Sequence, residues 1–118
     1  MNISTSKLLN MKISPRKLML VTNAISGLSV NEALKYLHFS RKRCSLDVSK
    51  CIISAVSNAN SSKQNFNISS LNNVYVSSVV GKGRQLKRMR CRARGKSALI
   101  LKRYSHLYVE LHTNKIEV

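Results

Sequence analysis

Hydrophobic residues recur through the first half of the chain at the spacing of amphipathic helices. A first set follows Ser14-Pro15 and comprises Leu18, Val21, Ile25 and Leu28. Ser is a favoured N-cap, and Pro fits the first helical position because its missing N–H would be unbonded there anyway. Gly27 supplies a C-terminal stop. This pattern predicts a helix that begins at Ser14-Pro15.

Two further helices are predicted from the same kind of spacing. Ser29 and Glu32 make a capping box, which precedes a stripe formed by Val30, Ala33, Leu34 and Leu37. A third helix begins near Ser40, and its stripe holds over four turns: Cys44, Val48, Cys51, Ile52, Ala55, Val56 and Ala59. The stretch from Asn58 to Asn65 is rich in Asn and Ser, which indicates a loop.

Elsewhere the period is two, as in strands. Residues 2–13 alternate loosely and predict an extended arm or edge strand. From Asn73 onward, Val74, Val76 and Val80 share one phase, and near the C-terminus Leu107, Val109 and Leu111 do the same. These last two runs predict antiparallel partners that cover the helices. We therefore expect an α+β fold, with three helices packed on a small antiparallel sheet, and a single domain over residues 1–118.

The net charge of the chain says more about its partners than the rest of its composition does. Lys and Arg number 21 against four acidic residues, a net charge of +17, which indicates a polyanionic partner: RNA, DNA or an anionic membrane surface. No apolar run approaches the roughly 20 residues of a membrane span. Residues 1–14 lack the apolar region of a secretory signal, and no transit peptide is evident. Frequent Asn, Ser, Ile and Lys suggest an AT-rich genome, as in an organelle or a reduced bacterium.

The densest run of cations lies in residues 82–103, between the two strand patterns. No carboxylate occurs between Val48 and Val109. Ala93-Arg94-Gly95 is the predicted turn of a long hairpin, because Gly95 can take the positive φ of a tight turn. Each arm would reach roughly 30 Å at about 3.3 Å per residue. Like charges on both strands push such a ribbon apart, so phosphates are expected to order it. The alternative is a solvated charge run or flexible tail, although tails usually sit at termini.

Other chemistry finds little support. No nucleophile–base pair or metal-ligand set is apparent, so we expect no catalytic residues, no metal and no cofactor. Cys44 and Cys51 are expected in the core, and three scattered cysteines argue for a reducing compartment. His106 could contact RNA or simply face water. A DNA-binding β-ribbon is a competitor, although such ribbons typically carry an apolar or Pro wedge at the tip. A small enzyme and a membrane-active peptide are weaker competitors.

Three separated motifs carry a family resemblance. Residues 86–103 followed by Tyr104-Ser-His-Leu107 closely resemble the hairpin of the universal large-subunit ribosomal protein twenty-two family, in its bacterial or organellar form. The Ile13-Ser-Pro-Arg-Lys-Leu18 stretch resembles that family's first helix start, and Ser57-Asn-Ala-Asn60 resembles the end of its long helix. Departures occur at Cys91, where Pro is common, at Arg90, where an apolar residue is common, and at Val80-Gly81, which lacks an acidic residue.

The resemblance implies a structural, non-enzymatic constituent of the large ribosomal subunit. It would bind large-subunit rRNA, support assembly and line the nascent-peptide exit tunnel with its extended hairpin, residues 82–103. Its partners would be rRNA, neighbouring large-subunit proteins and the nascent peptide, without a membrane span and without homo-oligomers. The expected location is a ribosome in an organelle such as a plastid or mitochondrion, with the bacterial cytoplasm as the alternative. The tip facing the tunnel would be Arg88, Met89, Arg90, Cys91, Arg92 and Ala93. The rRNA-binding residues would be Arg16, Lys17, Arg41, Lys42, Arg43, Lys82, Arg84, Lys87, Arg88, Arg90, Arg92, Arg94, Lys96, Lys102, Arg103 and His106.

Overall fold

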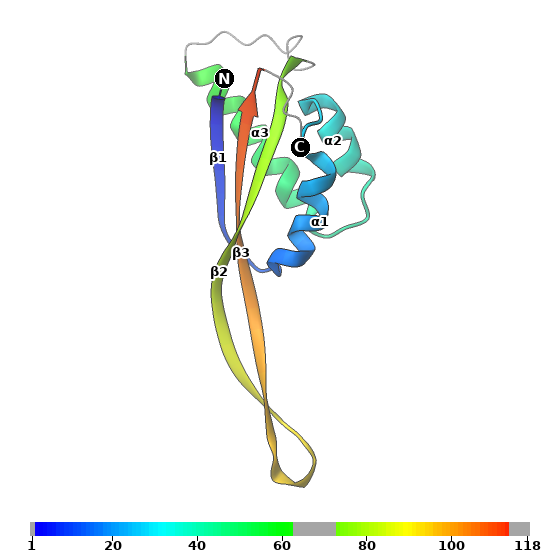
Figure 1. Ribbon diagram of the computed structural model, residues 1–118, viewed down its shortest axis with the longest axis vertical. Coiled ribbons are helices and arrows are strands. Elements are labelled where there is room, and N and C mark those ends of the chain that lie inside the picture. Colours follow the sequence, from blue (N-terminus) through cyan, green and yellow to red (C-terminus); the bar gives the residue numbers. More distant parts are fainter. Residues whose placement is uncertain (1, 63–72, 114–118) are drawn as a thin grey trace.

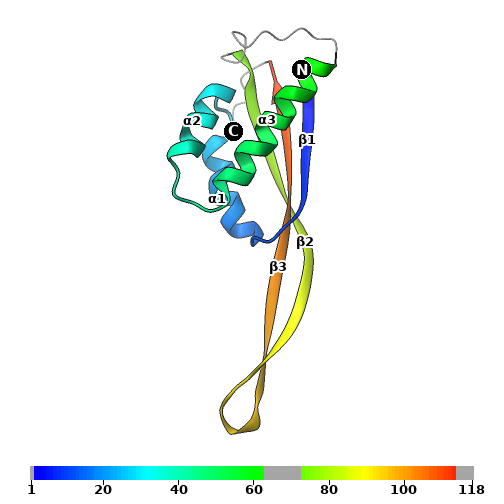
Figure 2. The ribbon, with the colours of Figure 1, turned by 180° about the vertical axis from the view of Figure 1, so that it is seen from behind.

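The computed structural model describes residues 2–62 and 73–113, and it places three helices on one face of an antiparallel sheet (Figures 1 and 2). The sheet order is β1-β3-β2. This arrangement confirms the predicted α+β fold. Along the chain the elements are β1 (Asn2–Met11), α1 (Pro15–Ile25), α2 (Val30–Phe39), α3 (Ser45–Ser61), β2 (Tyr75–Cys91), the short 3-10 turn η2 (Ala93–Gly95) and β3 (Ser97–His112).

The central strand β3 carries the inner face of the sheet. Leu107, Val109 and Leu111 are buried against the helices, as their alternation predicted, and Val76 joins them from β2. β1 is an edge strand, which agrees with the predicted arm. The start of the outer edge of β2 is covered by the link between α1 and α2, because Gly27 donates its N–H to the Val76 carbonyl at 2.9 Å. An edge that is covered in this way offers no template for unwanted strand pairing.

The helix ends follow the sequence signals closely. The capping box is present: the Ser29 hydroxyl accepts from the Glu32 N–H, and the Glu32 carboxylate accepts from the Ser29 N–H. α1 begins at Pro15 after Ser14, whose side chain makes no capping hydrogen bond. Beyond the end of α1, Gly27 adopts a left-handed φ of 81°, as expected of a glycine that stops a helix.

The third helix begins later than predicted, and it ends within the predicted Asn- and Ser-rich stretch. α3 begins at Ser45 rather than near Ser40, because residues 40–44 form a turn in which the Ser45 N–H donates to the Lys42 carbonyl. It also runs through the predicted loop start to Ser61. Asn58 donates its side-chain amide to the Thr5 carbonyl at 3.0 Å, and Ala59 is buried, so tertiary contacts hold this last turn helical. The rest of the predicted loop, residues 63–65, lies outside the described residues.

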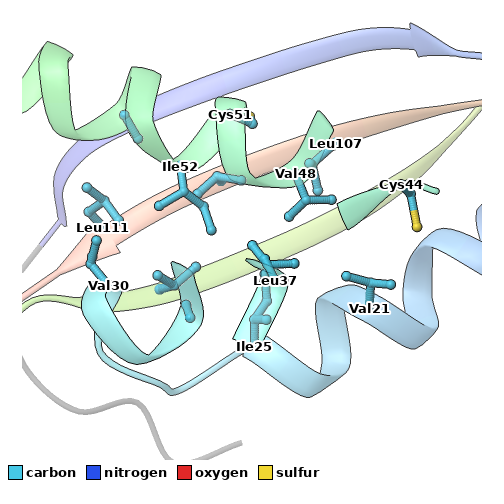
Figure 3. Close-up of a cluster of buried hydrophobic side chains, with 14 of the residues drawn as sticks. Val21, Ile25, Val30, Leu37, Cys44, Val48, Cys51, Ile52, Leu107 and Leu111 are labelled. Atoms are coloured by element: carbon cyan, nitrogen blue, oxygen red, sulfur yellow. The ribbon is translucent and has the colours of Figure 1, made fainter. Parts of the chain in front are cut away.

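One hydrophobic core joins the helices to the sheet (Figure 3). The predicted helical stripes supply it: Leu18, Val21 and Ile25 from α1, Val30, Ala33 and Leu37 from α2, and Val48, Cys51, Ile52, Ala55 and Ala59 from α3. Leu28, Leu34 and Val56 pack at its margin. Each fully buried aliphatic side chain of this kind stabilises the fold by about 1.5–3 kcal/mol.

Beyond this core, β2 and β3 continue as a two-stranded ribbon that leaves the helices behind (Figure 1). The molecule measures 64 × 26 × 22 Å, and its radius of gyration is 17.4 Å. A compact chain of this length would have a radius of about 13 Å. The excess is the hairpin, which protrudes as predicted.

Candidate nucleic-acid interface

The hairpin leaves the sheet at a β-bulge in β2. Lys82 pairs with Ser105 and Gln85 pairs with Arg103, so two residues of β2 (Gly83 and Arg84) lie opposite one residue of β3 (Tyr104). A bulge of this kind bends its strand and increases the local twist. The ribbon is therefore redirected at the point where it parts from the helices.

The far end of the hairpin is a tight turn at the predicted position. The Arg92 N–H donates to the Lys96 carbonyl at 2.7 Å and closes the turn around η2. Gly95 adopts a positive φ of 68°, as expected, and Arg94 also adopts one, at 57°. A left-handed conformation is strained for a residue with a side chain. Arg94 therefore owes this conformation to the turn rather than to its own preference.

The register between β2 and β3 keeps like charges from lying directly opposite one another in the hairpin. Lys87 pairs with Leu101, Arg88 with Ile100, Arg90 with Ala98 and Lys102 with Leu86, so each of these cations faces an aliphatic side chain. Arg103 faces Gln85. Like charges directly opposite one another destabilise a strand pair, whereas long cationic side chains cover apolar neighbours with their stems. The repulsion expected between like charges on the two strands is therefore reduced, because the cations are offset along the strands.

The same register gives the distal ribbon two different faces. One face carries Arg88, Arg90 and Lys102 with small or aliphatic partners. The other carries Lys87 opposite Leu101 nearer the base, and Met89 opposite Leu99 and Cys91 opposite Ser97 toward the tip. Met89 is 76% exposed and Leu99 is 60% exposed, so this second face presents apolar surface to its surroundings. Beyond Lys87, the paired strands of the ribbon thus offer cations on one side and a charge-poor surface on the other.

Almost none of the positive charge is neutralised among the residues that the structure describes. In residues 2–62 and 73–113 the acidic residues are Glu32, Asp47 and Glu110. Within those ranges the ion pair is between Glu110 and His112, at 3.4 Å, and no Lys or Arg takes part in one. A surface of unpaired lysines and arginines raises the local concentration of polyanions and binds phosphates.

A second cationic surface lies where the hairpin meets the helices. A pocket of about 590 Å³ opens there, which we call the junction pocket; its lining is Lys12, Ile13, Ser14, Lys17, Leu20, Lys42, Arg43, Cys44, Leu101 and Arg103. A smaller hollow of about 200 Å³ shares two of these residues and is lined by Ser14, Pro15, Arg16, Lys82, Gln85, Arg103 and Tyr104. Four separate stretches of sequence, residues 12–20, 42–44, 82–85 and 101–104, therefore supply one continuous basic surface.

This geometry, a helix-covered sheet with a long basic hairpin, agrees with what comparison of the sequence finds. Residues 6–112 match the family described as ribosomal protein L22p/L17e. The chain belongs to the ribosomal protein L22p/L17e family. It is similar to the large ribosomal subunit protein uL22 of Orientia tsutsugamushi, with 46% identity over 83% of this chain and 82% of the relative. It is 41% identical to that of Ehrlichia chaffeensis, over 90% of both chains, and 43% identical to that of Methylobacterium radiotolerans, over 84% and 75%.

Membership of the L22p/L17e family confirms the recognition made from three motifs, and this ribosomal-protein family is not one of enzymes. In residues 2–62 and 73–113, no three His, Cys, Asp or Glu side chains gather as a metal-ligand set. None of the helices in those ranges is long and apolar enough to cross a bilayer. Cys44 and Cys51 are buried in the core, as predicted, whereas Cys91 is exposed on the hairpin.

The structure brings together some of the predicted rRNA-binding residues of this family member and separates others. Lys17, Lys42, Arg43 and Arg103 line the junction pocket, and Arg16 and Lys82 line the adjoining hollow. Arg41 lines neither. The distal residues lie exposed along the hairpin and its turn: Arg84, Lys87, Arg88, Arg90, Arg92, Arg94 and Lys96. Lys102, also exposed, faces Leu86 near the base of the ribbon.

His106 lies apart from both surfaces. Its neighbours in β3 that point inward are Ser105 and Leu107, both buried, so the imidazole projects from the helix-free face of the sheet. Its Nδ1 accepts the backbone N–H of Asn10 at 3.0 Å. When the ring is neutral, its proton is therefore on Nε2, which remains available as a donor. Its predicted contact with RNA stays a prediction.

Sequence reasoning missed the apolar part of the junction pocket and one of its cations. Lys12 lies between a strand and a helix, and Leu20 looks in sequence like an ordinary exposed position of α1. No local signal says that residues 12–20 and 42–44 meet Leu101 and Arg103. Two tyrosines lie in different surroundings: Tyr104 lines the smaller hollow, while the Lys7 ammonium lies over the Tyr108 ring, 5.9 Å from its centroid.

Proposed function

We propose that this protein is a structural constituent of the large ribosomal subunit and that it binds large-subunit rRNA. The observation that carries the proposal is the hairpin beyond Gln85, which has cations offset along both strands, no acidic residue and little core of its own. An isolated two-stranded ribbon is marginal in water. Phosphates of a large folded RNA would stabilise it on all sides. The names of the bacterial relatives, large ribosomal subunit protein uL22, support the same conclusion.

The sixteen cationic and imidazole side chains listed in the sequence analysis would make the contacts. Fourteen of them fall in two groups, and Arg41 and His106 lie outside both. The junction group would lie on the RNA surface beside the body of the protein. The hairpin group would thread between RNA helices, where arginine forms forked bonds to phosphate and stacks on unpaired bases. Large folded RNA is recognised largely through shape, backbone and unpaired segments, which suits an extended ribbon better than a compact face.

The tip, residues 88–93, would line the nascent-peptide exit tunnel. Its charge-poor face, with Met89 and Leu99, is the part suited to a passing peptide, while Arg88 and Arg90 on the opposite face would hold rRNA. Neighbouring large-subunit proteins would contact the body. Because one ribbon reaches RNA far from the body, the protein would also help to join separate parts of the rRNA during assembly.

Sedimentation tests the central proposal. A tagged full-length chain should migrate with the large subunit in lysate, and it should remain there after a wash in about half-molar salt, because a threaded ribbon is held by more than surface charge. A peripherally bound cationic protein that makes many phosphate contacts loses affinity steeply over such a change in salt. Release at moderate salt, or migration with DNA, would count against the ribosomal function and favour the DNA-ribbon alternative.

A shortened hairpin tests the role of the arm. Replacing residues 86–102 by Asn-Gly joins Gln85 to Arg103, which already pair, through a favoured two-residue turn. The body should keep its fold, since its core lies elsewhere, but subunit assembly should be impaired. Normal assembly with this variant would contradict the role of the arm.

The compartment is a separate matter. The relatives named above are bacterial, which supports the bacterial cytoplasm, whereas the organelle expected from composition gains no support from them. Fractionation of the source cells, with ribosomes of each compartment probed for this chain, would distinguish the two.

A further inference from the structure

The junction pocket joins positive charge to an apolar floor. Five cations line it: Lys12 from the β1–α1 link, Lys17 from α1, Lys42 and Arg43 from the α2–α3 link, and Arg103 from β3. No acidic residue is in the lining, and no ion pair in the described residues involves these side chains. Four parts of the chain thus direct unpaired cations at one concave space.

Part of the lining of the same pocket is aliphatic, and we refer to this part as its floor. Ile13 and Leu101 are half-buried there, and Leu20 is 61% exposed although it lies in the middle of α1. An exposed leucine among cations is a poor surface for water and for phosphate alone. It is, however, a surface on which the flat face of a nucleobase can be buried. The volume of about 590 Å³ lies within the roughly 300–1,000 Å³ typical of ligand pockets.

From this combination we propose that the junction pocket binds one unpaired nucleotide of the rRNA. The base lies on Leu20, Ile13 and Leu101, and its phosphates are held by the surrounding cations. The inference deepens the proposed function and rests on it. The adjoining hollow extends the track, because Arg103 lines both spaces and Arg16 and Lys82 line the second. Those cations hold the phosphate of the next nucleotide.

Duplex RNA does not fit this site as well. A regular helix presents phosphates on a convex surface and keeps its bases stacked inside, so the aliphatic floor would stay uncovered. An unpaired nucleotide offers both a charged and an apolar part, and its base is already free of the pairing that would otherwise have to be broken. An acidic peptide with an apolar residue offers a similar combination, and it is an outcome that the experiment separates.

Photo-cross-linking tests the assignment directly. The full chain would carry p-benzoylphenylalanine in place of Leu20 and be assembled into large subunits, and reverse transcription would map the cross-linked rRNA positions. Ile53, a half-exposed aliphatic residue of α3 outside the pocket, is the matched control position. We expect Leu20 to give cross-links at one or two adjacent unpaired nucleotides that are absent with Ile53. Cross-links confined to paired nucleotides or to a protein would overturn the proposal.

Binding to the rRNA fragment so identified gives a second, independent measurement. Leu20→Ser should weaken binding about tenfold at constant salt, because it removes buried apolar contact, and should leave the salt dependence unchanged. Lys42→Gln should instead lower the slope of log K against log salt by about one. Removing the unpaired nucleotide from the fragment should weaken binding at least as much as Leu20→Ser does, because its phosphate contacts are lost as well. Leu20→Ser should then have no further effect on binding of the shortened fragment. Full additivity would overturn the pairing of Leu20 with that base.

Further outcomes distinguish failure of the pocket assignment from failure of the proposed ribosomal function. Displacement of the fragment by free nucleoside monophosphate at comparable concentration would assign the pocket to a free nucleotide rather than to RNA and overturn the proposal. A chain that sediments with the large subunit yet shows no Leu20 cross-link to unpaired RNA defeats only the pocket assignment. A chain that does not sediment with the subunit defeats the proposed function.

Discussion

The backbone of Gly83 lies directly against that of Tyr104, so that a Cβ on Gly83 would fall 2.9 Å from the Tyr104 carbonyl carbon and 3.0 Å from its oxygen. Real Cβ atoms do not approach backbone so closely. Gly83 belongs to the bulge from which the hairpin leaves the sheet. The absence of a side chain at this one position therefore lets the two strands stay paired while the ribbon bends.

The first prediction concerns this contact. Gly83→Ala should destabilise the protein by about 1–3 kcal/mol, because the obstacle is backbone that cannot rotate away. The measurement is urea unfolding, together with hydrogen exchange of the hairpin amides, which should become less protected. Gly81→Ala is the matched control, since a Cβ there would meet its nearest neighbour at an ordinary 3.5 Å. Equal effects from both substitutions would show that close packing at Gly83 is not what shapes the bulge.

Most of the helices and strands could be predicted because each has a local sequence pattern. The period-two run of Leu107, Val109 and Leu111 and the capping box of Ser29 and Glu32 need only nearby residues, and both are present as expected. Failures arose where distant contacts decide. The last turn of α3 stays helical because Asn58 reaches the Thr5 carbonyl, a partner 53 positions away, which no local signal reveals.

The candidate site divides in the same way. The cationic hairpin is a contiguous charge run with its turn at Gly95, so it could be found in the sequence alone. The junction pocket could not, since its lining joins Lys12 to Lys42 and Arg103 through the fold. The pairing of hairpin cations with aliphatic residues also depends on register, and the extra residue in the bulge sets that register. The alternation of residues within one strand does not reveal the register between the two strands.

A second prediction concerns Asn10, which lies in a bulge of β1. Leu9 and Asn10 lie together opposite His106, and Asn10 has a left-handed φ of 57°. Asn tolerates this conformation and glycine adopts it freely, whereas a β-branched residue does not. Asn10→Gly should therefore change the free energy of unfolding little, while Asn10→Val should lower it by about 1–2 kcal/mol. Thermal unfolding would check this. A Val variant as stable as the Gly variant would contradict the role assigned to the backbone conformation.

A third prediction concerns the cationic face of the distal hairpin. If Arg88 and Arg90 each hold a phosphate, Arg88→Gln and Arg90→Gln should each reduce the slope of log K against log salt by about 0.7–0.9 for binding to large-subunit rRNA. The double variant should lose about twice as much. The folded body should be unaffected, since both side chains are exposed. Lys35→Gln on α2, an exposed cation outside the proposed interface, is the control and should leave the slope unchanged. An equal change with Lys35→Gln would indicate diffuse attraction in place of defined contacts.

The fourth prediction concerns the pH dependence of stability, through Cys51. Burial raises the pKa of the Cys51 thiol, and the hydrogen bond with the Ser6 hydroxyl, 2.9 Å away, opposes this only in part. In the unfolded chain the thiol loses its proton at about pH 8.5, whereas in the native protein it keeps it to a higher pH. The stabilisation that this difference represents is fully present below about pH 8.5. It is lost as pH rises toward the native pKa, with a slope of up to about 1.4 kcal/mol per pH unit.

Cys51→Ser isolates that contribution, because a serine hydroxyl is close in size and does not titrate in this range. The free energy of unfolding would be measured for both proteins between pH 7 and pH 10, and the difference between them followed. All other ionisable groups are the same in both chains, so their effects largely cancel. We expect the advantage of the native sequence to be constant up to about pH 8.5 and to shrink above it. A difference that stays flat to pH 10 would mean that the buried thiol does not keep its proton as the packing of β1 on α3 requires.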